Sequence, residues 1–163
     1  MCLKLKQLEL NSDCYDLLQH IDKNENLFIN EVKDQSVEFY RDWLIKMDNW
    51  SKGLDLPDGY TKQTIFFLYL DDLPIGIGKL RHTLTKEMIK YGGNIGYAID
   101  NRYRNKGYGK ILFGLLIDKA KELNIDTLVA TVEKSNIYSD NIVKSFNGKV
   151  IYENNKRRSY VLY

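Results

Sequence analysis

The chain has 163 residues, of which 44% are hydrophobic and 12% aromatic, and 24 Lys and Arg residues nearly balance 22 Asp and Glu residues. This length suits one globular domain whose core needs no disulfide or structural zinc, and the composition argues against a disordered chain. A formal net charge of +2 argues against nucleic-acid binding by bulk positive charge.

Three segments of the N-terminal third show regular apolar patterns. Residues 3–10 alternate leucine with mostly polar residues, which favours an edge strand. In residues 15–21, and more clearly in 36–50, apolar side chains recur three or four residues apart, which predicts two helices. The second helix carries Trp43 and Trp50, which we expect in the core, with the lining of a pocket as the alternative.

The middle of the chain is rich in strand signals. A turn at residues 53–59, which contains Pro-Asp-Gly, precedes the β-branched and aromatic segment 64–70. Asp-Asp-Leu-Pro then leads into segment 75–84, so the two segments predict a hairpin. A short helix-compatible stretch, 85–93, is followed by a strand at 94–99.

The C-terminal part alternates between helical and strand patterns. The strongest helix is predicted at residues 107–124, where apolar side chains form one face. A strand at 127–132, a helix at 135–146 and two closing strands at 149–153 and 159–163 follow. Hairpins in the first half and this alternation in the second predict a mixed α/β sheet.

The cysteines and the apolar stretches bear on location. Cys2 and Cys14 belong to no CxxC motif or Cys/His cluster, so we expect free thiols in a reducing cytoplasm and no metal. The first ten residues interleave charge with leucine, so a secretory signal is not expected. No stretch approaches the ~20 apolar residues that span a bilayer, which predicts a soluble, cytoplasmic protein that does not enter membranes.

The most informative segment is the basic, glycine-containing stretch 100–110, between a strand and an amphipathic helix. Gly107 and Gly109 let the backbone approach a ligand, and the N–H groups and dipole at the helix start favour an anion such as phosphate. The alternative is a turn with a solvated basic face. The Walker pattern is absent, and Leu112 stands where a dinucleotide fingerprint needs its third glycine.

Read as Arg104-x-x-Gly107-x-Gly109, this stretch resembles the acetyl-CoA pyrophosphate loop of the GNAT superfamily of N-acetyltransferases. Asn136-Ile137-Tyr138-Ser139 resembles its Asn-x-x-(Ala/Ser) motif, and segments 80–84 and 92–99 resemble a bacterial subgroup of predicted acetyltransferases. The resemblance implies an α/β fold with a mixed, mostly antiparallel central sheet flanked by helices. It also implies one domain over 1–163, with a helical acceptor-side part at 1–60 and a CoA-binding core at 64–163.

The resemblance further implies roles for individual residues. Arg104 and Lys106 would add charge near the phosphates, the backbone of Ile99 would pair with the pantetheine arm, and Asn136 would hold the arm from the other side. Acetyl-CoA would be the co-substrate of a direct transfer without a metal. Backbone N–H groups of one run of residues would cradle the pyrophosphate: Asn105, Lys106, Gly107, Tyr108, Gly109 and Lys110.

Two features of the family pattern are missing. Residues 94–97 offer no carboxylate as general base, and Val143 stands where many members carry the tyrosine that protonates the leaving thiolate. His82, Glu133 and Ser139 are the candidate substitutes. A structural His82, a solvated or helix-capping Glu133, and a Ser139 that caps its helix or bonds the cofactor are the alternatives.

The sequence therefore predicts an acetyl-CoA-dependent N-acetyltransferase that acts on an amine of a small molecule or a peptide. The missing carboxylate and tyrosine favour, as the alternative, a non-catalytic acyl-CoA-binding or regulatory module. Nucleic-acid binding through the basic clusters 102–110 and 156–158 is a weaker alternative, because the overall charge is close to neutral. The closing strands could pair between two copies of the chain as a homodimer.

Overall fold

The computed structural model describes residues 1–25 and 27–163. The central element is a seven-stranded sheet in the order β1-β4-β5-β6-β7-β9-β8. The strands are β1 (Leu3–Gln7), β2 (Asn24–Glu25), β3 (Phe28–Ile29), β4 (Gln63–Leu70), β5 (Leu73–Arg81), β6 (Ile95–Ile99), β7 (Val129–Glu133), β8 (Lys149–Glu153) and β9 (Arg157–Val161). The helices are α1 (Tyr15–Gln19), α2 (Val37–Ser51), α3 (Lys86–Tyr91), the 3-10 turn η1 (Asn101–Tyr103), α4 (Tyr108–Glu122) and α5 (Ile137–Ser145).

All neighbouring strands of the sheet are antiparallel except β6 and β7, which run parallel. The mixed, mostly antiparallel sheet expected from the sequence is therefore confirmed. β1 forms one edge through its pairing with β4, as its alternating pattern predicts. β9 lies between β7 and β8, and β8 forms the second edge of the sheet.

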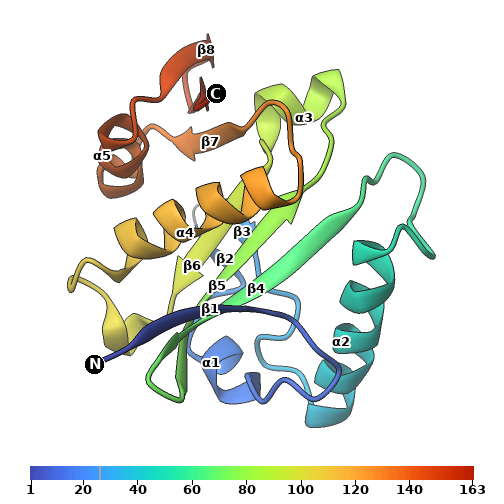
Figure 1. Cartoon of the computed structure of the whole chain (residues 1–163). Coiled ribbons are helices and arrows are strands. Elements are labelled where there is room, and N and C mark those ends of the chain that lie inside the picture. Colours follow the sequence, from blue (N-terminus) through green and yellow to red (C-terminus); the bar gives the residue numbers. More distant parts are fainter. Residues whose placement is uncertain (26) are drawn as a thin grey trace.

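Both faces of the sheet are covered, as the alternation of β4 requires. Ile65 and Phe67 belong to a core cluster with α1 and α2, whereas Phe66 and Leu68 belong to a second cluster with α4. Figure 1 shows α4 lying across one face of the sheet, with α2 away from it beside β4. Trp43 and Trp50 are buried in the first cluster, in agreement with a core role.

The N-terminal part contains strands as well as the two expected helices. Besides the expected edge strand β1 it holds a short pair of strands, β2 and β3, which the sequence patterns did not predict because each strand has only two residues. The first helix is shorter than expected, Tyr15–Gln19, and its N-cap is Cys14.

Helix starts follow two different patterns. Ser36 caps α2 by accepting a hydrogen bond from the N–H of Phe39 at 3.1 Å, as serine commonly does. α4 instead begins after Gly107, which has a φ of +83° and offers no side chain as a cap.

No helix in the described part of the chain is long and apolar enough to cross a membrane. The cytoplasmic location stays a prediction.

Candidate active site

The central feature of the site is a splay between the parallel strands β6 and β7. The two strands pair only at Ile95 and Ala130, and no pairing continues toward their C-terminal ends. A cleft of about 260 Å³ lies at this splay and is lined by residues of β6, β7, α4 and α5. In Figure 1, β7, α5 and β8 lie to one side of the β6–β5–β4 part of the sheet.

The backbone of β6 leaves polar groups unpaired along this splay. The N–H of Asp100, just after β6, donates to the carbonyl of Ile75 at 3.0 Å, so the backbone of Asp100 is directed toward β5. Alternate residues of an antiparallel strand direct their N–H and C=O groups to the same side. Ala98 therefore also bonds to β5, whereas Tyr97 and Ile99 direct their backbone groups into the splay. The carbonyl of Ile99 already accepts from Arg104 Nε, and an extended ligand can pair with the other groups.

A second set of unpaired N–H groups lies at the start of α4. The first intrahelical bond of this helix runs from the N–H of Ile111 to the carbonyl of Gly107, so the N–H groups of residues 108–110 have no intrahelical acceptor. Asn105 and Gly107 both have positive φ angles, +59° and +83°. A β-carbon at Gly107 would meet nothing within 4 Å. An anion can approach this helix start closely.

Arg104 lies at the open end of the splay with a partner that sequence reasoning missed. Its Nη2 donates to Glu25 Oε2 at 2.6 Å, and its Nε donates to the carbonyl of Ile99 at 3.1 Å. Glu25 comes from the β2–β3 hairpin, and its burial raises the pKa of its carboxyl while Arg104 opposes that rise. The guanidinium thus fixes the end of β6, and its charge is already paired with a carboxylate.

On the α4–α5 face of the cleft, the side chains of Asn136, Ser139 and Tyr97 form a chain of hydrogen bonds. Asn136 caps α5, because its Oδ1 accepts from the N–H of Ser139 at 3.1 Å. This corrects the idea that Ser139 is itself the cap. The hydroxyl of Ser139 instead lies 2.8 Å from the hydroxyl of Tyr97, which reaches across from β6. Burial raises the pKa of Tyr97 to about 12, so it is protonated at neutral pH.

The opposite face of the cleft is lined by Lys79 and Arg81 of β5. The Lys79 ammonium lies 5.7 Å from the centroid of the Phe28 ring. Burial, together with the charge of Arg81, lowers the pKa of Lys79 from 10.5 to about 7. Arg81 Nη1 donates to the carbonyl of Gly93 at 3.0 Å, next to the closed end of the splay.

The predicted site residues divide into two groups. Six of them line the cleft: Ile99, Arg104, Asn105, Tyr108, Gly109 and Asn136, and Ser139 joins them from the catalytic candidates. Lys106, Gly107 and Lys110 belong to the same loop and helix start but are not among the residues that line the cleft.

The other two catalytic candidates do not line the cleft. His82 Nε2 lies 2.8 Å from Thr64 Oγ1, and burial lowers the pKa of the imidazole. Glu133 ends β7, and its carbonyl accepts from the N–H of Asn136 at 2.9 Å. The structure therefore does not bring either side chain together with Ser139 as a catalytic set.

A splayed strand edge beside an anion-binding helix start can hold an extended, phosphate-bearing thioester, as an acyl-CoA-dependent transferase requires. A sequence model of the acetyltransferase (GNAT) family matches residues 16–147. The chain belongs to this family. Membership confirms the expected GNAT fold and the expected class of enzyme, an acetyl-CoA-dependent N-acetyltransferase.

Solved structures with the same fold cover almost the whole chain. Campylobacter jejuni N-acetyltransferase PseH in complex with acetyl coenzyme A superposes with a TM-score of 0.64 at 18% identity, over 98% of this chain and 97% of that one. An N-acetyltransferase from Staphylococcus aureus Mu50 gives 0.64 at 17% identity, over 100% of both chains. RimL, an alpha-N-protein acetyltransferase of a ribosomal protein, in complex with coenzyme A, gives 0.70 at 14% identity, over 98% and 92%. No curated protein sequence matches the chain.

The residues present fit acetyl-CoA. The unpaired N–H groups at the start of α4 suit its pyrophosphate, and the open space at Gly107 lets phosphate oxygens approach the backbone. The backbone groups of Tyr97 and the N–H of Ile99, which are directed into the splay, suit the amides of the pantetheine arm. Among residues 1–25 and 27–163, no group of three His, Cys, Asp or Glu side chains could hold a metal ion.

Proposed function

We propose that this protein transfers the acetyl group of acetyl-CoA to a primary amine of a small molecule or a peptide. The single observation that carries the proposal is the splay of β6 from β7, which pair only at Ile95 and Ala130, directly beside the start of α4. Acetyl-CoA supplies the activated acetyl group, and the chain's own residues bind it and position the amine.

The direction of the splay determines which end of acetyl-CoA lies at which end of the cleft. The helix start that suits the pyrophosphate follows the C-terminal end of β6, where the splay is open, and the strands close at Ile95. A pantetheine arm that runs along β6 from that helix start brings the thioester toward Gly96 and Tyr97. The backbone N–H of Tyr97, which the register directs into the splay, can donate to the acetyl oxygen as negative charge develops there.

The hydroxyl pair of Tyr97 and Ser139 is our candidate for the proton donor to the leaving sulfur. The two oxygens lie 2.8 Å apart on the α4–α5 face of the cleft. Tyr97 stays protonated at neutral pH because burial raises its pKa to about 12. This pair would supply the hydroxyl that Val143 lacks at the family's usual tyrosine position, and Ser139 keeps the role of candidate catalytic residue.

Two measurements test the proposal. Isothermal titration calorimetry of the purified chain with acetyl-CoA tests binding, and release of free CoA thiol tests transfer to kanamycin, spermidine, the amino acids and short peptides with free N-termini. We expect binding and thiol release above the hydrolysis rate with at least one of these amines. Binding without transfer to any amine would favour the non-catalytic acyl-CoA-binding module, and absence of binding would contradict both functions.

A further inference from the structure

Among the described residues that line the cleft, Lys79 is the only lysine, and neither acetyl-CoA binding nor protonation of the sulfur requires it. It lies on β5 directly opposite Gly96 of β6. A β-carbon at Gly96 would lie 3.7 Å from Lys79 Cε and 3.7 Å from the Phe28 ring. The lysine side chain therefore lies over Gly96, which has no side chain of its own. This position is one residue from the closed end of the splay at Ile95.

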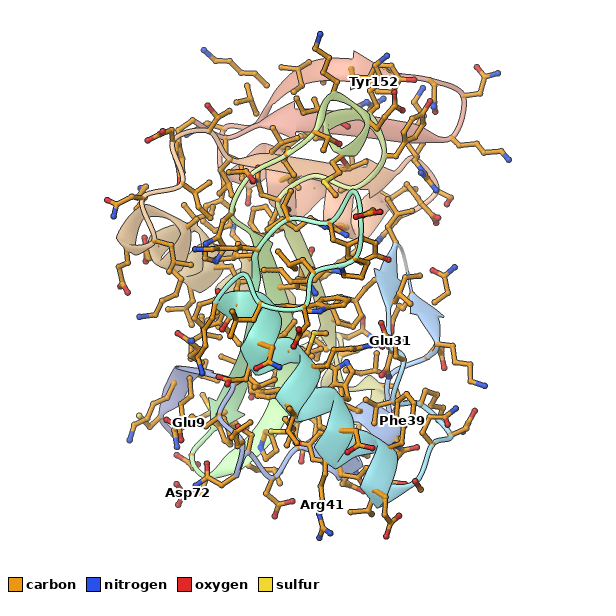
Figure 2. All side chains as sticks on the ribbon, turned by 90° about the vertical axis from the view of Figure 1, so that its right-hand side faces the viewer. Glu9, Glu31, Phe39, Arg41, Asp72 and Tyr152 are labelled. Carbon is orange, nitrogen blue, oxygen red and sulfur yellow. The ribbon has the colours of Figure 1, made fainter. Side chains whose placement is uncertain are left out.

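The surroundings of the Lys79 ammonium do not satisfy its charge. Among the residues that the structure describes, Nζ has no hydrogen-bond or ion-pair partner; its neighbour is the Phe28 ring. Arg81, on the same strand face, repels the charged form. Glu31 attracts the charged form, but its carboxylate is paired with Lys46 of α2; Figure 2 shows Glu31 between the β2–β3 hairpin and α2.

The two faces of β6 carry different chemistry. Tyr97 directs its side chain to the α4–α5 face, where it meets Ser139. Gly96 and Ala98 face the other side, toward Phe28 and the cluster of α1 and α2. An amine that approaches from the α1–α2 side meets Lys79, while the sulfur on the opposite face lies near the hydroxyl pair.

We propose that Lys79 is the general base of the transfer and takes the place of the carboxylate that residues 94–97 do not provide. This inference rests on the proposed function and deepens it by naming the catalytic residue on the acceptor side. A lysine can accept a proton only in its neutral form, and a pKa of about 7 makes that form abundant at neutral pH.

The proton balance is complete without another reactant. Neutral Lys79 Nζ takes one proton from the acceptor ammonium, which frees the nitrogen lone pair. The nitrogen then bonds to the acetyl carbon as the carbon–sulfur bond breaks. The nitrogen's second proton passes to the CoA sulfur through the hydroxyl pair or solvent, and Lys79 afterwards releases its proton to solvent.

Glu25 is the competing base, because its carboxylate also lines the cleft. Both of its oxygens lie close to Arg104 Nη2, at 2.5 and 2.6 Å. The arginine therefore opposes the rise in the pKa of Glu25 that burial causes, and it occupies both oxygens that would accept a proton. Arg104 also binds the carbonyl of Ile99 at the open end of the splay. Lys79 lies nearer the closed end, toward which the thioester points.

A titration of Lys79 tests the inference without any turnover. The chain is labelled with ¹³C-lysine, and the Lys79 signal is identified by its absence from the spectrum of Lys79→Met. We expect the Lys79 signal to titrate with a midpoint near pH 7 in wild-type protein. A midpoint above pH 10 would overturn the inference, because such a lysine is almost wholly charged at neutral pH.

Kinetics separate a base from a positive charge. Lys79→Met and Lys79→Arg should both lower kcat/KM for the best amine of the panel by about 100-fold and remove the acidic limb of its pH profile, with unchanged acetyl-CoA affinity. The arginine variant keeps the charge but does not release a proton at neutral pH. Lys149→Met, at an exposed position on β8, is the matched control and should keep wild-type activity.

Three outcomes would overturn the inference: full activity of Lys79→Met, rescue by Lys79→Arg, or loss of the acidic limb in Glu25→Gln with the limb kept in Lys79→Met. If wild-type protein transfers acetyl to no amine of the panel, the proposed function fails instead. The titration then still reports whether Lys79 is neutral at pH 7, so the two failures are distinguishable.

Discussion

Tyr97 illustrates how one side chain can supply a group that the family pattern places elsewhere. It starts from β6, crosses the splay and ends 2.8 Å from Ser139 Oγ on α5. Its ring also packs edge-on against Phe113 of α4, with the ring centroids 5.5 Å apart. The hydroxyl is therefore held in position by contacts on both sides, which favours a single geometry toward a bound thioester.

We expect Tyr97→Phe to lower kcat about 10- to 100-fold, since a general acid contributes on this order or more, while the dissociation constant of acetyl-CoA changes little. The ring and its packing remain, and only the proton donor is lost. Calorimetry and thiol release measure the two quantities. Tyr91→Phe, on the exposed side of α3, is the control; wild-type kcat in Tyr97→Phe would assign the proton transfer to Ser139 or solvent.

Lys79 also affects the pH dependence of stability. Its pKa is about 7 when folded and 10.5 ordinarily, so between pH 7 and 10 the unfolded chain holds one more proton at this site than the folded chain. The free energy of unfolding then rises with pH by up to about 1.4 kcal/mol per unit from this group. Below pH 7 Lys79 is protonated in both the folded and the unfolded chain. This group then no longer changes the free energy of unfolding with pH.

Urea unfolding of wild-type protein and Lys79→Met at pH 6, 7, 8 and 9 measures this effect. We expect the wild-type free energy of unfolding to rise relative to that of the variant from pH 7 to 9, and to lie lowest relative to it at pH 6. There the wild type holds a charged ammonium in a half-buried position beside Arg81, and the variant lacks that charge. Parallel pH curves for the two proteins would show that Lys79 titrates at its ordinary pKa in the folded state.

Among the helices, α4 has a start that favours ligand binding over the stability of the helix itself. Ser36 and Thr85 cap α2 and α3 with their side chains, whereas Gly107 before α4 has no side chain to offer. Glycine in place of a capping serine, threonine, asparagine or aspartate costs a few tenths of a kcal/mol. The first N–H groups of α4, with the positive end of the helix dipole, become the binding site for phosphate.

A matched pair of substitutions at Gly107 tests this element. Asparagine and aspartate have nearly the same shape and both tolerate a positive φ better than most residues, but only aspartate adds a negative charge where the pyrophosphate is expected. We expect Gly107→Asp to weaken acetyl-CoA binding at least tenfold more than Gly107→Asn, with similar circular dichroism for both. Equal affinities in the two variants would mean that the phosphates lie elsewhere.

The parts of the site that the sequence could predict are local ones. The 100–110 stretch and Asn136–Ser139 are read from glycines, a basic residue and an asparagine at short spacing, and the structure joins them at one cleft. The sequence pattern could not predict a role for Lys79 in the site. That role depends on the β5–β6 register, which places Lys79 opposite Gly96. Glu25 was missed for a similar reason, since it pairs with Arg104 from a hairpin too short to detect.

The strands and helices were predicted more completely than the site. Apolar spacing located the elements of the central sheet and the long helices, because burial on one face leaves a period in the sequence. The expected strand 75–84 is observed as Leu73–Arg81, and His82 leaves the strand to bond Thr64. Whether His82 acts in catalysis was undecidable from spacing, because one residue's shift at a strand end changes the face it reaches.

The central sheet has two faces, and we expect each to bind a different substrate. α4 and α5 cover the face that suits the cofactor, while α1, α2 and the β2–β3 hairpin cover the face from which we expect the amine to approach. The splay between β6 and β7 is the passage between them. Its closed end must be rigid, because an in-line approach of amine and thioester depends on the angle between the two halves of the sheet.

Asn94 provides that rigidity through one buried side chain. Its Oδ1 accepts from the N–H of Val129 at 2.8 Å, and its Nδ2 donates to the carbonyl of Arg81 at 2.9 Å. Its own N–H donates to the carbonyl of Val129 at 2.7 Å. One residue that is 1% exposed thus connects β5, β6 and the first residue of β7.

Asn94→Ala should therefore reduce both stability and acetyl-CoA affinity. It leaves a buried N–H and a buried carbonyl without partners, at about 1–3 kcal/mol each, and a loss of about 2 kcal/mol lowers Tm by roughly 4–8 °C in a domain of this size. The looser closed end should raise the dissociation constant of acetyl-CoA several-fold. Scanning calorimetry and titration calorimetry measure the two effects, with Asn141→Ala, exposed on α5, as control. An unchanged dissociation constant in a destabilised Asn94→Ala protein would mean that other contacts fix the splay, since the two halves of the sheet would then keep their angle without this amide.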